Sequence, residues 1–156
     1  MPPTFTTLPV KIGVLADTHD RLPHSVLTQL HDCDQIWHLG DVCLPSTLSP
    51  LYALGKPLSI VHGNCDSEES WPMTLTHHMA GKTFHLIHIP PAQAPLGTDI
   101  LLHGHTHVPC DHTISGCRYL NPGCISRPNR GAPASFATLT VHPNTEILWQ
   151  LHKFQA

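Results

Sequence analysis

The segment Val10–Asp20, VKIGVLADTHD, decides the fold class that the sequence predicts. Its first seven residues form a nearly continuous apolar run, typical of a strand buried on both faces of a parallel sheet. The run stops abruptly at Asp17, where a polar loop begins. Pro23 then suits the first turn of a helix whose apolar side chains recur over residues 26–30. A strand, a polar loop and a helix in this order are typical of α/β proteins, which bind ligands at strand carboxyl ends.

The same pattern recurs twice in the first half of the chain. A short strand is expected over Gln35–Leu39, followed by Gly40-Asp41 and a candidate helix over Pro45–Leu54. A third strand is expected over Pro57–Val61, and the polar residues His62–Asp66 follow it. The first 66 residues therefore indicate an α/β sheet with a site at the carboxyl ends of its strands.

The second half of the chain is expected to be mostly β. The sequence predicts hairpins that turn at Gly81-Lys82, Ser115-Gly116 and Pro143-Asn144, and a strand over Asp99–His103. No linker, internal repeat or low-complexity run divides the chain. We therefore expect a single domain over residues 1–156, consistent with roughly 150 residues per domain.

Histidine is unusually frequent: it accounts for 15 of 156 residues, against 8 lysines and arginines together. Because the formal net charge is -3, general nucleic-acid binding is not expected. No apolar run is long enough to span a membrane and no secretory signal is evident, so a cytoplasmic location with six reduced cysteines is expected. None of the cysteines forms a Cys-x-x-Cys pair, which disfavours a thiolate-bound zinc ion.

Side chains able to bind a metal follow five of the expected strands. Asp17 and His19 follow the first strand, and His105 and His107 follow the strand over Asp99–His103. Residues i and i+2 of a strand point to the same side, so each pair forms a natural chelate where extended geometry persists. The remaining candidates are Asp41, Asn64 and His88. One pair alone arises often by chance, whereas all of these residues beside glycines at the turns are a specific indication of metal binding.

The order of these residues resembles the calcineurin-like metallophosphoesterases, whose motifs run Asp-x-His, Gly-Asp, Gly-Asn, a lone His and Gly-His-x-His. The corresponding residues here are Asp17-Thr18-His19, Gly40-Asp41, Gly63-Asn64, His88 and Gly104-His105-Thr106-His107. Gly63-Asn64-Cys65-Asp66 and Asn121-Pro122-Gly123 are similar to the small bacterial and archaeal phosphodiesterase branch, which includes the eukaryotic retromer scaffold subunit. The resemblance implies an α/β fold, a four-layer α-β-β-α sandwich of two facing mixed β-sheets flanked by helices.

The resemblance also implies a centre of two divalent metal ions per chain. It assigns one cation to Asp17, His19, Asp41 and His107, and a second, bridged by Asp41, to Asn64, His88 and His105. A bridging carboxylate holds two cations about 3.5 to 4 Å apart. Mixed imidazole and oxygen ligands suit manganese first, with iron, zinc, nickel and magnesium as alternatives. The residues expected to take part in catalysis are Asp41, Asn64 and His105.

The activity implied by the resemblance is hydrolysis of a small phosphodiester or nucleotide-like substrate by a two-metal-activated hydroxide. One alternative is a phosphomonoesterase, and another is a non-catalytic protein-interaction scaffold on the same fold. A scaffold is expected to have lost metal ligands, and none is visibly lost; a large exposed apolar patch away from the metals would favour it. The sequence leaves the physiological substrate, the native metal and the oligomeric state open, a homo-oligomer included.

Several positions depart from the family pattern. Cys65 stands where many members have a histidine thought to protonate the leaving group, so the general acid is unassigned. Ile89-Pro90 replaces a usual Gly-His, and three prolines between His88 and Gly104 leave little room for a helix. Cys124 replaces a usual serine and is expected to alter a phosphate contact. Arg127 lies just beyond and is expected to hold the substrate phosphate.

The remaining histidines, and two aspartates near the motifs, are not expected to bind metal. His62 is expected to support the site rather than to bind metal, and His85 and His103 compete with His88 as histidines that end or line apolar strands. Asp20 and Asp66 are expected either to orient a ligand imidazole or to cap a helix. Most of the histidines without motif context are expected at the surface: His24, His31, His38, His77, His78, His112, His142 and His152.

Overall fold

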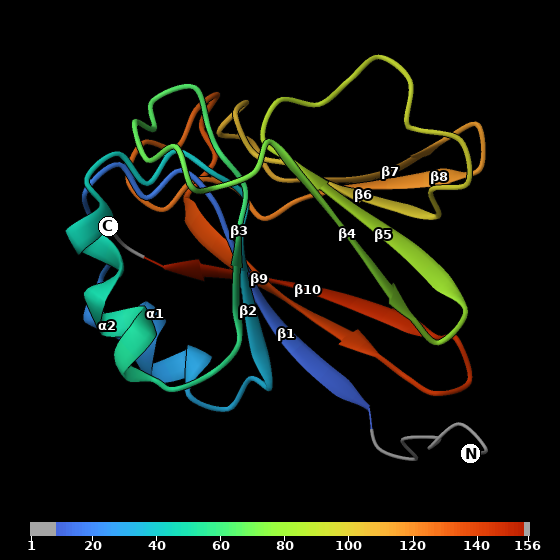
Figure 1. Ribbon diagram of the computed structural model, residues 1–156, viewed down its shortest axis with the longest axis horizontal. Coiled ribbons are helices and arrows are strands. Elements are labelled where there is room, and N and C mark those ends of the chain that lie inside the picture. Colours follow the sequence, from blue (N-terminus) through green and yellow to red (C-terminus); the bar gives the residue numbers. More distant parts are fainter. Residues whose placement is uncertain (1–8, 155–156) are drawn as a thin grey trace.

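Two five-stranded β-sheets lie face to face in the computed structural model, which describes residues 9–154 (Figure 1). The first sheet has the order β10-β9-β1-β2-β3 and the second the order β4-β5-β6-β8-β7. The strands of the first sheet are β1 (Val10–Leu15), β2 (Gln35–His38), β3 (Leu58–Ile60), β9 (Ala134–Val141) and β10 (Ile147–Phe154). Those of the second are β4 (Thr74–Met79), β5 (Lys82–Ile87), β6 (Ile100–Leu102), β7 (Cys110–Ile114) and β8 (Cys117–Asn121).

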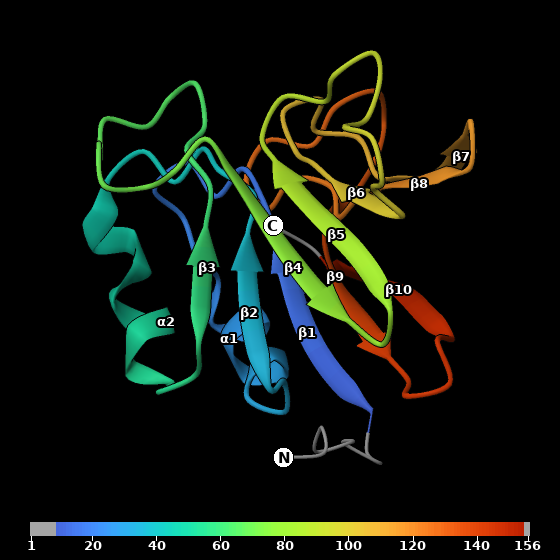
Figure 2. The same ribbon diagram turned by 45° about the vertical axis from the view of Figure 1, so that its right-hand side comes forward.

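Each sheet mixes parallel and antiparallel pairs. β1, β2 and β3 are parallel, and so are β5, β6 and β8, whereas the outer pairs β9-β10, β4-β5 and β7-β8 are antiparallel hairpins. The three predicted hairpins are therefore confirmed. Figure 2 shows β1, β2 and β3 running in one direction, with the loops after them and after β5 gathered at one end of the sandwich. This end carries the polar residues that the sequence placed after its strands.

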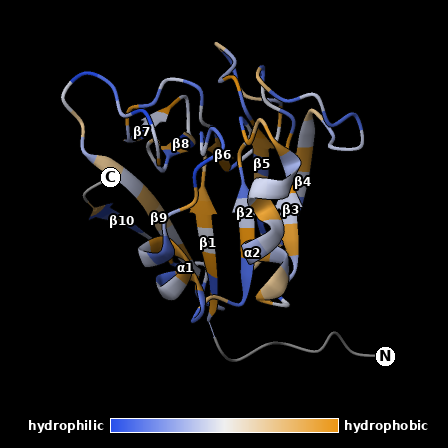
Figure 3. Cartoon of the chain, turned by 90° about the vertical axis from the view of Figure 1, so that its left-hand side faces the viewer, coloured by the Kyte–Doolittle hydropathy of each residue, from blue (hydrophilic) through white to orange (hydrophobic). Residues whose placement is uncertain are grey.

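Both α-helices cover the outer face of the first sheet (Figure 3). They are α1 (His24–Leu30) and α2 (Ser49–Ala53), and the 3-10 helix η1 (Pro45–Leu48) leads into α2. The single helix expected over Pro45–Leu54 is thus divided, because Pro50 lacks the backbone N–H that a continuous helix would bond to residue 46. No helix within residues 9–154 has the length and apolar character needed to cross a membrane.

The outer face of the second sheet is covered by coil rather than by a helix. The segment between β5 and β6 contains three prolines, which remove backbone donors, and it forms no helix. Ala94 from this segment packs against a small buried cluster that includes Leu101 and Tyr119. The expected α/β fold of two facing mixed sheets is confirmed. The helical layer expected outside the second sheet was wrong, because this coil covers that face within residues 9–154.

The main hydrophobic core lies between the two sheets. Ile12, Val14 and Ala16 alternate toward it along the first sheet, as the period of two for a strand requires. They meet Phe84 and Leu86 from β5, all fully buried. A second core packs Leu15 and its neighbours against the helices, which explains why the sequence of β1 is apolar on both faces.

We predict that Leu86→Ala lowers the free energy of unfolding by about 2 to 5 kcal/mol, because it leaves a cavity between the sheets. The matched control is Leu96→Ala, the same chemical change at a fully exposed side chain in the β5-β6 segment, with an expected effect within about 0.5 kcal/mol. Urea denaturation of both variants checks this, and equal losses would contradict the two-sheet core.

Candidate metal centre

All seven predicted ligand side chains come from loops at one end of the sandwich. Asp17 and His19 follow β1, Asp41 follows β2, Asn64 follows β3, His88 follows β5, and His105 and His107 follow β6. Parallel strands deliver their carboxyl ends to one edge of a sheet, and two facing sheets bring two such edges together. The topology therefore places residues separated by up to 90 positions beside one another.

Four of these side chains form a tight group. Asp17, His19, Asp41 and His107 each offer one donor atom, and these atoms all lie within 4.8 Å of one another. Asp17 Oδ1 is 3.5 Å from His107 Nε2 and 3.9 Å from His19 Nε2. Asp41 Oδ2 is 3.6 Å from His19 Nε2. Two carboxylate oxygens and two imidazole nitrogens at these separations can bind one divalent cation.

A second group adjoins the first through Asp41. Asn64 Oδ1 lies 2.9 Å from His88 Nε2 and 3.0 Å from His105 Nδ1. Asp41 Oδ2, which faces His19, is also 3.3 Å from His88 Nε2. One carboxylate oxygen thus stands between two donor groups, as a bridge between two cations requires.

Two buried polar atoms of the first group have no hydrogen-bond partner, as expected of ligands to a cation. Among residues 9–154, Asp17 Oδ1, His19 Nε2 and His77 Nε2 are the buried side-chain nitrogen and oxygen atoms with no hydrogen-bond partner. Leaving such atoms unpaired is costly in a folded protein. Two of the three face each other within the first group, so a cation there would satisfy both, and the donor set fits a divalent metal.

The imidazole rings of His88 and His107 are fixed by backbone carbonyls. His88 Nδ1 donates to the carbonyl of Leu39 at 2.7 Å, and His107 Nδ1 donates to that of Arg127 at 2.7 Å. Each ring consequently directs its Nε2 atom toward the carboxylates. This arrangement, in which the second ring nitrogen is bound to a fixed oxygen, is common among metal-binding histidines.

The backbone at the pairs Asp17/His19 and His105/His107 is not extended, although extended backbone was the expected reason for their convergence. Asp17 (φ 55°), His19 (φ 42°), His105 (φ 70°) and His107 (φ 62°) all adopt left-handed conformations beyond the strand ends. Asp41 does the same, at φ 62°. That premise was wrong, although the pairs do converge. Left-handed backbone is unfavourable for residues other than glycine and clusters at functional sites.

Asp66 holds the two central loops together. Its Oδ2 accepts the backbone N–H of Asp41 at 2.9 Å and that of Gly63 at 2.8 Å, while Oδ1 accepts the N–H of Cys43 at 2.8 Å. It therefore neither orients a ligand imidazole nor caps a helix, the two roles expected from the sequence. Asp20 does not cap a helix either: its Oδ1 accepts the N–H of Leu44, the residue before η1, at 2.6 Å, and η1 has no side-chain cap.

The loop after β8 supports the ligand loops through buried polar contacts. Asn121 Nδ2 donates to the Gly104 carbonyl at 3.2 Å, and the thiol of Cys124 donates to the Asp17 carbonyl at 3.2 Å. Cys124 is fully buried and its sulfur accepts the Arg127 N–H at 3.0 Å, so its effect on a phosphate contact stays a prediction. Arg127 is exposed and contributes its carbonyl to His107, so a phosphate contact by its guanidinium stays a prediction.

Burial and charge give the two carboxyl groups different pKa values. Burial raises the pKa of Asp17 to about 6, although the charges of His88 and His107 act to lower it. Burial also acts to raise the pKa of Asp41, but its interactions with His88 and the Cys65 N–H hold that pKa well below its usual range. Asp41 is therefore ionised throughout the neutral range, as a bridging ligand must be.

His38 is a site residue that the sequence assigned to the surface. It is fully buried, its Nδ1 accepts the N–H of Gly40 at 3.1 Å, and its Nε2 lies 3.1 Å from the Thr18 hydroxyl. The ring therefore connects the loops that carry Asp17 and Asp41. Burial lowers the pKa of His38 to about 4, so the ring is neutral. The one sequence signal was its position within the apolar run of β2.

An open groove of about 880 Å³ adjoins the metal ligands at His105. Its walls are mostly apolar, with polar groups at His103, His112 and Arg130. The groove lies on the side of the second sheet, between the coil after β5 and the loops beside β7. It offers room for an organic group next to the donor cluster.

We predict that acid destabilises the metal-free protein through His38. Its folded pKa of about 4 lies below the unfolded value of about 6.5, so the unfolded state binds more protons and this contribution is lost as pH falls. The loss between pH 7 and pH 5 is about 2 kcal/mol. Urea denaturation of His38→Gln is expected to show a pH dependence smaller by that amount, and exposed His31→Gln no change. An unaltered slope in His38→Gln would contradict the neutral buried ring.

Comparisons with known proteins agree with this geometry. The family model for the calcineurin-like phosphoesterase superfamily domain matches residues 10–144. A probable metallophosphoesterase of Methanothermobacter thermautotrophicus is 32% identical, over 79% of this chain and 81% of the relative. The phosphodiesterase YfcE of Escherichia coli is 29% identical, over 83% of this chain and 87% of the relative.

Solved structures share the fold. The phosphoesterase YfcE from E. coli superimposes with a TM-score of 0.75 at 23% identity, covering 92% of this chain and 99% of that structure. Vps29 from Entamoeba histolytica, solved with Zn²⁺, superimposes with a TM-score of 0.72 at 20% identity. The match covers 94% of this chain and 100% of that structure. The motif order and the extent of these matches establish that the chain belongs to the calcineurin-like phosphoesterase superfamily.

Proposed function

We propose that the protein is a phosphodiesterase that uses two divalent metal ions to hydrolyse a small phosphodiester. The observation that carries the proposal is the pair of adjoining donor groups that meet at Asp41 Oδ2, with buried Asp17 Oδ1 and His19 Nε2 lacking any partner. Structural metal sites and catalytic ones differ in access. Here Asn64 and His105 are exposed, so one side of the cluster is open to a substrate.

The residues divide into two cation sites with one shared ligand. Asp17, His19, Asp41 and His107 would hold the first cation, and Asp41, Asn64, His88 and His105 the second. Manganese suits this mixture of imidazole and oxygen donors, with iron, zinc, nickel and magnesium as alternatives. Bound cations would supply Lewis acidity toward the phosphoryl oxygens and lower the pKa of a water so that it attacks phosphorus.

The side chains of the protein hold the metal ligands in position and keep Asp41 charged. Asp41 keeps its negative charge between the two groups because its pKa is held low, and the carbonyls of Leu39 and Arg127 prevent the His88 and His107 rings from turning away. Asn64 and His105 are the exposed members and are expected to contact the substrate together with Asp41. Preorganised groups of this kind avoid reorganisation during the reaction.

The groove beside His105 supports a diester rather than a monoester substrate. A diester carries a second organic arm, which needs space next to the phosphorus. The groove of about 880 Å³ provides that space, and Arg130 at its edge offers a charge to a nucleotide-like phosphate. Arg127 is proposed as a second phosphate contact, since its backbone carbonyl binds the ring of the ligand His107 and places the residue beside the centre.

The scaffold alternative has less support in this chain. A protein that only binds partners has no need of the shared carboxylate or of the fixed imidazole rings, and all seven donors are present and converge. The fold similarity to Vps29 does not itself distinguish the two functions. The cytoplasmic location and a homo-oligomer stay predictions from the sequence.

We predict that the manganese-loaded protein hydrolyses bis(p-nitrophenyl) phosphate and that Asp41→Asn reduces this activity by more than about 100-fold, because it removes the charge shared by both cations. The matched control is Asp32→Asn, the same change at an exposed carboxylate outside the site, which is expected to retain full activity. Circular dichroism should show that both variants are folded. Equal turnover by Asp41→Asn, or by chelated protein, would contradict the mechanism.

We also predict a preference for diesters. Under the same conditions kcat/KM for bis(p-nitrophenyl) phosphate is expected to exceed that for p-nitrophenyl phosphate by about tenfold, because the groove receives the second arm with about 1.4 kcal/mol of binding energy. A rate ratio that favours the monoester would assign the protein to the phosphomonoesterases.

A further inference from the structure

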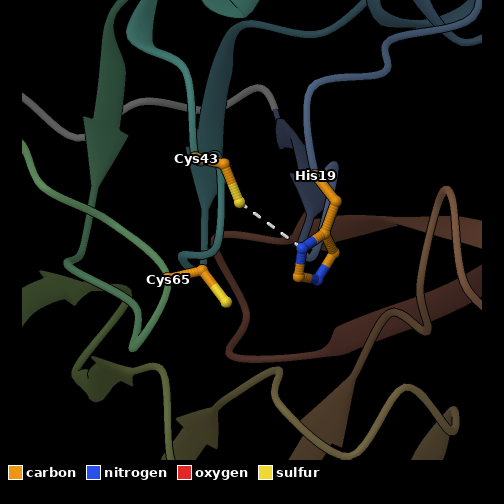
Figure 4. Close-up of side chains that lie close together, drawn as sticks. All are labelled: His19, Cys43 and Cys65. Carbon is orange, nitrogen blue, oxygen red and sulfur yellow. Dashed lines mark hydrogen bonds between the residues drawn. The ribbon is translucent and has the colours of Figure 1, made fainter.

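Two cysteines meet the far side of the His19 ring. His19 Nδ1, Cys43 Sγ and Cys65 Sγ all lie within 4.8 Å of one another, and Cys43 Sγ is 3.4 Å from His19 Nδ1. Figure 4 shows the three side chains reaching into a common space from the loops after β1, β2 and β3. The cysteines are 22 positions apart, so this cluster has no Cys-x-x-Cys signature, and the fold alone creates it.

The second nitrogen of His19 has an unusual partner for this site. The corresponding nitrogens of His88 and His107 each contact a backbone carbonyl oxygen at 2.7 Å. His19 Nδ1 instead faces the sulfur of Cys43, a weak hydrogen-bond acceptor. The ring is therefore not fixed by an oxygen acceptor, and its Nδ1 is directed at two thiols.

The separations suit a thiophilic cation. A tetrahedral zinc ion with bonds of about 2.3 Å to sulfur and 2.05 Å to nitrogen places those two atoms about 3.6 Å apart. The observed 3.4 Å between Cys43 Sγ and His19 Nδ1 is close to that value. Cysteine binds a metal as the thiolate, so a cation that binds here displaces the thiol protons.

The backbone fixes the two cysteines in this position. The N–H of Cys43 is held by Asp66 Oδ1 and that of Cys65 by Asp41 Oδ1, each at 2.8 Å. Cys43 is half-buried, whereas Cys65 is exposed and leaves a route from solvent. Two sulfurs and one nitrogen leave a fourth tetrahedral position for water.

We propose that His19 Nδ1, Cys43 Sγ and Cys65 Sγ form a third metal site, for a thiophilic cation of the zinc class, next to the two-cation centre. Sulfur and imidazole donors select such a cation over manganese or magnesium. The site shares the His19 ring with the first cation site. A neutral imidazole has one free lone pair, so a His19 ring that binds this cation through Nδ1 carries its proton on Nε2 and no longer binds the first cation. Occupancy therefore inhibits the phosphoesterase centre, a consequence that rests on the proposed function.

The direct test uses cobalt, whose bonds to thiolate produce a charge-transfer absorption band in the near ultraviolet. The two-cation centre contains nitrogen and oxygen donors, so it gives no such band. Reduced protein in excess manganese is titrated with Co²⁺, and wild type is expected to show the band. Cys43→Ser and Cys65→Ser are each expected to weaken cobalt binding by at least tenfold, and the double variant to lose the band.

Cys110→Ser is the matched control. Cys110 Sγ lies 3.5 Å from His103 Nε2, a cysteine and histidine pair without the third donor, so this variant is expected to keep the full band. Absence of the band in wild type, or its persistence in the double variant, would overturn the proposal. A band lost in Cys65→Ser but unchanged in Cys43→Ser would also overturn it, because cobalt would then have only one thiolate ligand.

Activity gives the second readout. In excess manganese, one equivalent of Zn²⁺ is expected to inhibit wild type at least tenfold more strongly than the double variant, each relative to its own activity without zinc. Equal inhibition would overturn the regulatory consequence. A wild-type protein with the cobalt band but no hydrolysis would contradict the proposed function and support the third site, so the two failures are distinguishable.

Discussion

Two buried carboxylates within reach of several imidazole rings are the constraint on which the rest of this structure depends. Asp17 is fully buried with one oxygen unpartnered, and Asp41 places one oxygen between His19 and His88. Charges buried at this density are stable in a protein only when protonated, paired or bound to a cation. In the metal-free protein, burial raises the pKa of Asp17. A bound cation would stabilise the ionised carboxylate and lower that pKa again.

Hydrogen bonds between the loops, rather than helices, hold the metal ligands in place. Asp66 binds three backbone N–H groups around the site, and His38 connects the loops of Asp17 and Asp41 from within the core. Gly63 is required because a Cβ there would overlap the backbone and side chain of Asp41. These contacts hold ligands in left-handed conformations that isolated loops would avoid.

Much of this was predictable from the sequence, and for physical reasons. Apolar runs that end in polar residues gave the strands, and the ordered motifs gave the seven side chains that converge at one end of the sandwich. The backbone geometry was not predictable, because left-handed conformations at Asp17 and His107 depend on contacts from other loops. His38 and Asp66 were misassigned because each has partners far away in the sequence: the Thr18 hydroxyl for His38, and the N–H groups of Asp41 and Cys43 for Asp66.

The pairing of Cys43 with Cys65 also depends on the fold. Local spacing disfavoured a thiolate site, yet parallel strands β2 and β3 bring both loops to the same edge of the sheet. A short motif reports only ligands that are neighbours in sequence. In a sheet with parallel strands, sites are assembled across loops, so spacing rules miss them.

The most direct test of the central claim is the number and position of metal ions in protein loaded with manganese. Elemental analysis combined with anomalous diffraction at the manganese edge is expected to give two ions per chain, one beside Asp17 and His107 and one beside Asn64 and His88, with Asp41 between them. A single ion, no ion, or two ions distant from Asp41 would contradict the two-cation centre.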